Sequence, residues 1–127
     1  MANELTYQIQ VLLRYAGVSD QFASGSKVVN QTNKYFIKAV QNIGFATHEA
    51  LDMGAEINAG NIGYVLGVNL GVNNIDVGQD LVGVFYPMVR LKPGEFAYAR
   101  WDASTIGLPY AKASVAATDL FYTVYAT

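Results

Sequence analysis

Residues 62–101, IGYVLGVNLGVNNIDVGQDLVGVFYPMVRLKPGEFAYARW, decide the fold of this chain. The stretch opens with large apolar residues at every second position, which is typical of a β-strand with two different faces. One face carries Ile62, Tyr64, Leu66, Val68 and Leu70. The other is made mostly of small side chains, among them Gly63, Gly67, Asn69 and Gly71. Because a missing side chain leaves space, we expect a bulky neighbour or another backbone to approach the glycines.

A second apolar run, residues 82–91, leads into a predicted chain reversal at residues 92–95, Lys-Pro-Gly-Glu. Pro93 presets a negative φ at the first central position of a type II turn, and Gly94 supplies the positive φ at the second. Glu95 closes the turn, and the residues after it alternate again. The turn is therefore predicted to join two strands of an antiparallel pair. We expect Gly78 to be a structural turn residue as well.

Towards the N-terminus, apolar residues alternate with polar ones over residues 5–15, which predicts a half-buried strand. Its apolar positions are Leu5, Tyr7, Ile9, Val11, Leu13 and Tyr15. Residues 21–33 are polar and weakly patterned, so we expect a long exposed loop with room for a short strand around residues 27–29. Residues 1–4 are expected to form an N-terminal arm.

Towards the C-terminus, β-branched and aromatic residues predict strands over residues 34–43, 108–113 and 119–127. Residues 47–53 suit either one helical turn or an edge strand, and residues 103–107 suit a turn. No crossover helix pattern occurs between the strands. The expected fold is all-β: a single domain over residues 1–127, built as an antiparallel β-sandwich or jelly roll of about eight strands.

Composition excludes several functional classes. Only 14% of the 127 residues are charged and the formal net charge is −2, against roughly 25% charged residues in ordinary soluble domains. The eight basic residues are scattered singly, so we expect no nucleic-acid partner. The longest uncharged stretch is rich in asparagine, so we expect no membrane segment. A surface with so little repelling charge favours a protein that works in contact with others.

The sequence offers no readable catalytic or metal centre. His48 is the only histidine, and Asp52 stands where a second histidine would complete a zinc motif. Ser24 and Ser26 lie in no nucleophile turn, and the acidic residues single out no pair. We therefore expect no enzyme activity, no metal and no cofactor. Nine tyrosines and Trp101 could form a sugar-stacking platform, although packing in the core or in an interface is favoured for them.

Residues spread over the last two thirds of the chain resemble a class of small β-sandwich virion proteins of tailed bacteriophages. They follow the order I-G, A-L-x-x-G, G-Y-V-L-x-x-N-L, N-I-x-V-G, F-Y-P, L-K-P-G-E-x-A, Y-A-K-A and D-L-x-Y. The residues are Ile43, Gly44, Ala50, Leu51, Gly54, Gly63, Tyr64, Asn69, Leu70, Asn74, Ile75, Val77, Gly78, Phe85, Pro87, Leu91, Pro93, Gly94, Glu95, Ala97, Tyr110, Ala111, Ala113, Asp119, Leu120 and Tyr122.

The resemblance implies a structural protein without catalytic residues. It would bind the outside of the capsid as a decoration or cement protein and bridge neighbouring major capsid subunits. A tail or head-tail accessory protein is the first alternative, and a carbohydrate-binding β-sandwich is the second. The implied location is the virion, after synthesis in the host bacterial cytoplasm.

Two partners are expected for such a protein: the major capsid protein and further copies of this chain, as a homo-trimer before a dimer. Candidate contacts lie outside the predicted strand ladders, in the arm of residues 1–4, the loop of residues 21–33 and the turn of residues 102–107. The candidate interface residues are Met1, Ala2, Asn3, Glu4, Gln21, Phe22, Lys27, Asn30 and Thr105.

Overall fold

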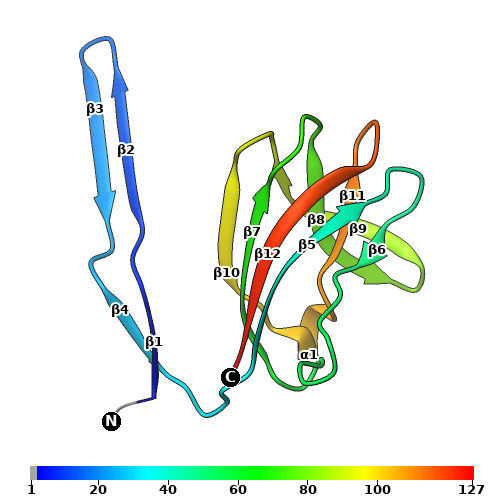
Figure 1. Ribbon diagram of the computed structural model, residues 1–127. Helices are drawn as coiled ribbons and strands as arrows, with labels where there is room; N and C mark the ends of the chain where they lie inside the picture. Colours follow the sequence, from blue (N-terminus) through cyan, green and yellow to red (C-terminus); the bar gives the residue numbers. More distant parts are fainter. Residues whose placement is uncertain (1–2) are drawn as a thin grey trace. The chain divides into compact units, whose positions relative to one another are not determined.

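The computed structural model describes residues 3–127 and divides into two compact units (Figure 1). The first, which we call the hairpin unit, ends at Thr32, and the second, the sandwich unit, spans Asn33–Thr127. The described residues form twelve strands and one short helix, so the predicted all-β class is confirmed, with more strands than expected. The predicted sandwich corresponds to the second unit, and the first 32 residues form a unit of their own.

The hairpin unit is a ribbon of two antiparallel ladders (Figure 1). Strands β2 (Gln10–Tyr15) and β3 (Val18–Ala23) pair with each other, and β1 (Glu4–Tyr7) pairs with β4 (Lys27–Asn30). The strand expected over residues 5–15 is therefore interrupted at residues 8–9. The short strand expected around residues 27–29 corresponds to β4. Two other expectations are wrong: residues 21–33 are not a long loop, because they also hold the end of β3, and Glu4 is already in a strand.

A bulge between β3 and β4, which together form the return strand of the ribbon, explains why these two strands are hard to recognise in the sequence. Residues 24–26 lie opposite only two residues, 8 and 9, and Gly25 takes a φ of +65°. The backbone N–H and the Oγ of Ser24 hold the bulge through hydrogen bonds with the Ile9 carbonyl and N–H, both at 2.9 Å. The extra residue reverses the alternation of the return strand, so its apolar positions change from even to odd numbers.

The sandwich unit consists of two four-stranded antiparallel sheets. The first has the order β10 (Phe96–Arg100), β7 (Ile62–Asn69), β12 (Thr118–Ala126), β5 (Phe36–Ile43). The second has the order β6 (Glu49–Ala50), β11 (Tyr110–Ala113), β8 (Ile75–Leu81), β9 (Val84–Leu91). Among the described residues no ladder joins the two sheets, so the sandwich is not closed. Of the two predictions for residues 47–53, the edge strand is confirmed by β6.

The core lies between the two sheets, and small residues make room for a central tyrosine. Tyr122 is buried and lies between Gly67 on β7 and Ala39 on β5. Its hydroxyl donates a hydrogen bond to the Asp52 carbonyl at 2.5 Å, and burial raises its pKa. The inward face of β7 is thus the face of small residues, with Val65, Gly67 and Asn69. Its large residues at 64, 66 and 68 lie on the outward face of the sheet.

The predicted turn at residues 92–95 is confirmed, but its role in the topology differs. Gly94 has a φ of +81°, and the Glu95 N–H donates to the Lys92 carbonyl at 2.9 Å. The predicted pairing of the flanking strands is wrong, because β9 and β10 belong to different sheets. Gly94 and Glu95 exchange backbone hydrogen bonds with Asn69, at 2.9 and 3.0 Å, and this directs β10 alongside β7.

Two further local predictions need correction. Gly78 is not in a turn: it lies within β8 opposite Pro87, where the register shifts between Val77 and Gly78. Residues 103–106 form a helical turn, α1 (Ala103–Ile106). Asp102 caps this helix, and hydrogen bonds from the hydroxyls of Ser104 and Thr105 lower the pKa of its carboxyl.

Candidate assembly surface

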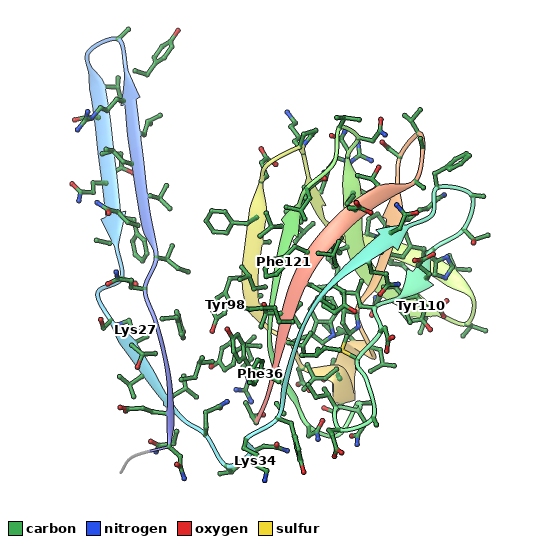
Figure 2. The ribbon with its side chains drawn as sticks, in the orientation of Figure 1. Lys27, Lys34, Phe36, Tyr98, Tyr110 and Phe121 are labelled. Atoms are coloured by element: carbon green, nitrogen blue, oxygen red, sulfur yellow. The ribbon has the colours of Figure 1, made fainter. Side chains whose placement is uncertain are left out.

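The outward face of the first sheet is built from every second residue of its four strands. Side chains directly opposite each other in register point to the same face, and three rows of such partners cross this sheet. The rows are Phe96, Val68, Phe121 and Val40; Tyr98, Leu66, Thr123 and Lys38; Arg100, Tyr64, Tyr125 and Phe36. Nine of these twelve side chains are apolar or aromatic, and we call this surface the aromatic face. Figure 2 labels Phe36, Tyr98 and Phe121 on it.

Several side chains of the aromatic face are exposed to solvent. Phe36 is 62% exposed, Val40 55% and Phe96 70%. They come from the two edge strands, β5 and β10. Between them Leu66, Val68, Phe121 and Tyr125 are half-buried, and Tyr64 and Thr123 are buried. The outward face of an antiparallel sheet in contact with water is normally polar. A contiguous apolar surface on a soluble protein is typical of an interaction site.

The charged residues in the three rows are both cations. The Arg100 guanidinium lies over the ring of Tyr64, with its carbon 5.7 Å from the ring centroid. That ring stacks in turn on Tyr98, with centroids 5.6 Å apart and an interplanar angle of 10°. Lys38 is exposed on β5. The three rows therefore combine apolar area with two cations, which favours a partner surface that is apolar and acidic. Beyond them, on the same side of β12, the Asp119 carboxylate accepts a hydrogen bond from the Asn42 side chain.

The outward face of the second sheet has the opposite character. Arg90 and Asp76 form a two-pronged ion pair across β8 and β9, at 2.7 and 3.0 Å, and these hydrogen bonds raise the pKa of Arg90. Lys112 on β11 is the register partner of Asp76. This face carries the charges that a solvated sheet normally presents. Strands β8 and β9 also expose large apolar side chains, among them Val84 and Met88, so the two sheets differ in their ion pairs and not in apolar exposure alone.

The hairpin unit also has one apolar and one polar face. In the β2–β3 ladder, Val11 is opposite Phe22, Leu13 opposite Asp20, and Tyr15 opposite Val18, which places these six side chains on one face. Its five apolar members are each between 50% and 74% exposed. The other face carries Gln10, Leu12, Arg14, Ser19, Gln21 and Ala23. We call the first surface the hairpin's apolar face.

The structure separates the interface residues that the sequence suggested. Met1 and Ala2 lie outside the described residues. Asn3, Glu4, Gln21, Phe22, Lys27 and Asn30 all lie exposed in the hairpin unit. Within this set Phe22 belongs to the apolar face and Gln21 to the polar one. Thr105 lies in the sandwich unit, where its Oγ1 donates to Asp102 Oδ2 at 3.1 Å.

Sequence reasoning missed the aromatic face as a surface. The strands that form it were predicted, but the side of each strand that faces the core was not. One signal was present: Tyr98, Phe121 and Tyr125 alternate along their strands with residues that are small or buried in the core. In the sheet these three residues are register partners of the large residues of β7. Only the strand order shows that these positions form one continuous surface.

The remaining chemical candidates have structural roles. The His48 side chain contacts Asp80 through Nε2 at 2.5 Å and stacks on Phe85. This hydrogen bond and a second one from the Gly83 N–H lower the pKa of Asp80. Among residues 3–127 no cluster of three or more potential metal ligands occurs. Trp101 is buried and donates to the Gly107 carbonyl at 2.7 Å, so it offers no stacking platform.

Within the part of the chain that the structure describes, no helix has the length and apolar character needed to cross a bilayer. No protein-family model, curated protein or solved structure matches this chain.

Proposed function

We propose that this protein is a structural component of a tailed-phage virion that binds the capsid exterior and bridges neighbouring major capsid subunits. The observation that supports this most strongly is the aromatic face, an apolar surface with exposed Phe36, Val40 and Phe96 on an otherwise charge-poor protein. Such a surface is suited to contact with another protein, because burying it removes apolar area from water.

The proposed mechanism is mechanical. A cement protein adds burial across the joint between two capsid subunits, so that separating these subunits also requires breaking its contacts. A contact of about 800 Å² per partner is typical of a specific complex, and repeating it over a shell multiplies a modest stabilisation. A rigid sandwich is suited to this role because it transmits load without local rearrangement.

The number of copies per virion tests this proposal. Purified virions would be separated into heads and tails, and the protein quantified against the major capsid protein by mass spectrometry. We expect hundreds of copies, all in the head fraction. A small copy number in the tail fraction would instead support the tail accessory alternative, and absence from virions would contradict both.

A binding experiment is the second test of the proposed function. Shells that lack this protein would be mixed with the purified chain and sedimented. We expect saturable binding at a fixed ratio to the major capsid protein, and shells that stay intact to a higher temperature. Binding without any gain in shell stability would contradict the cement role.

A further inference from the structure

We infer that the hairpin's apolar face of one copy packs on the aromatic face of a second copy of this chain. The inference concerns a contact between identical chains, and it stands independently of the proposed role on a capsid. Four observations support it: the exposed apolar side chains of the hairpin unit, the size of the two surfaces, their charges, and the length of the hairpin unit.

The hairpin unit needs a second layer. A two-stranded ribbon is at best marginally stable alone in water. No residue in the described part of the hairpin unit is buried, and Val11, Leu13, Tyr15, Val18 and Phe22 are all exposed. A sheet with one apolar face becomes stable by packing that face on another layer. The ribbon is amphipathic, so a single partner layer is enough.

The two surfaces match in character and size. Both are faces of antiparallel sheets with alternating side chains, so they can pack face to face as the layers of a sandwich do. Five large side chains that are half exposed or more present on the order of 500 Å² of apolar surface. Covering them with an equal area of the aromatic face buries about 1,000 Å² in total, the lower limit for a specific protein interface.

The charges are complementary. Asp20 is the single charged residue on the hairpin's apolar face, next to Leu13 in the ladder. The charged residues in the rows of the aromatic face are the cations Lys38 and Arg100. An isolated carboxylate in an apolar contact is costly unless it meets an opposite charge. The aromatic face supplies that charge, whereas Arg90, Asp76 and Lys112 on the second sheet already compensate one another.

The length of the hairpin favours a second copy over the chain's own sheet. From Val18 to Asn30 the return strands cover thirteen residues, or about 40 Å at ~3.3 Å per residue. Strands β5 and β12 have eight and nine residues, so the sheet is only about 30 Å long. Tyr15 and Val18 lie at the end of the ribbon farthest from Thr32, so the chain between them and the sandwich unit is longer than one strand of the sheet. A neighbouring copy can bind the distal part of the ribbon at the middle of its sheet.

Sedimentation velocity of the purified full chain tests the contact with matched variants. Leu13 and Leu12 are adjacent, 50% and 48% exposed, and lie on opposite faces of β2. We expect Leu13→Glu to raise the dissociation constant of self-association by about tenfold or more, as at an interface hot spot, and Leu12→Glu to leave it nearly unchanged. Val40→Glu on the aromatic face should act like Leu13→Glu, with Val72→Glu in an exposed loop as its control.

Mixing the two weakened variants distinguishes contacts between chains from contacts within one chain. The Val40→Glu copy keeps an intact hairpin and the Leu13→Glu copy an intact aromatic face. We therefore expect the mixture to form a complex with the mass of two chains while each variant alone sediments as a monomer. Thermal unfolding of the sandwich unit by circular dichroism checks that each variant is folded. A monomeric wild type at tens of micromolar, equal losses in Leu12→Glu and Leu13→Glu, or no complex in the mixture would overturn the inference.

Discussion

Gly78 shows how a single missing side chain fixes the register of the second sheet. A Cβ placed on Gly78 would lie 2.0 Å from the Tyr86 carbonyl oxygen and 2.8 Å from the Pro87 Cα. Both are backbone atoms of β9, so they cannot move aside without breaking the ladder at the register shift. We expect Gly78→Ala to lower the free energy of unfolding by about 2–3 kcal/mol, as overpacking of a tight site does.

Gly67 provides the matched control at the same scale. A Cβ there would meet Leu120 and Leu91 only at 3.6 and 3.7 Å, which are ordinary contact distances. Gly67→Ala should therefore change the free energy of unfolding by less than about 1 kcal/mol, because the methyl fits and the unfolded chain loses entropy. Urea denaturation of both variants gives the comparison. Similar losses of stability in the two variants would show that the register shift at Gly78 places no special requirement for glycine.

At the scale of an element, the β8–β9 hairpin contains an unfavourable turn residue. Its two central residues, Val82 and Gly83, have φ angles of +53° and +81°, and Val82 is 94% exposed. A β-branched residue is strained at positive φ, whereas asparagine is favoured there before glycine. We expect Val82→Asn to raise the free energy of unfolding by about 1 kcal/mol, the cost of one such strained residue.

Val72 is the control for this substitution, because it is also almost fully exposed but has no positive φ. Val72→Asn should leave the midpoint of urea denaturation unchanged. If Val82→Asn fails to stabilise the protein while Val72→Asn is neutral, the turn carries no strain.

The elements also show how far sequence reasoning reaches. Strands β5, β7 and β12 were predictable, because alternating apolar residues report local backbone geometry. The pairing of β10 was not, because a Pro-Gly turn fixes a chain reversal but not which strand is hydrogen-bonded next; the contacts of Asn69 decide that. Strand β3 was missed, and β4 was expected only as a short strand in a loop, because the bulge at Gly25 changes the phase of their alternation.

The candidate surface was harder to predict for a related reason. In β7 the face with Gly67 and Asn69 points into the core, and the face with the larger residues does not. Gly67 and Ala39 are the register partners of Tyr122 on the two neighbouring strands. The larger residues of β7 therefore lie on the outward face, and periodicity cannot distinguish an inward apolar face from an outward one. Strand order is long-range information that no local pattern contains.

At the scale of the whole molecule, the two units differ in their ability to fold alone. Every residue of the buried core cluster, from Ile43 to Ala126, belongs to the sandwich unit. A piece comprising residues 33–127 should therefore unfold cooperatively, with a free energy of unfolding within about 1 kcal/mol of the value for that unit in the full chain. Residues 3–32 include no buried side chain, so a peptide of residues 1–32 should lack stable strands, because an isolated hairpin is marginal in water.

Circular dichroism and urea denaturation of the two pieces measure this difference, with the full chain as the reference. The outcome also bears on assembly: a folded 33–127 piece keeps the aromatic face but has no hairpin to donate, so it should stay monomeric at concentrations where the full chain associates. It should still bind one full-length copy, through that copy's hairpin. A 33–127 piece that unfolds without cooperativity would show that the hairpin is part of the sandwich's own stability, and a stably folded 1–32 peptide would show that the ribbon needs no second layer.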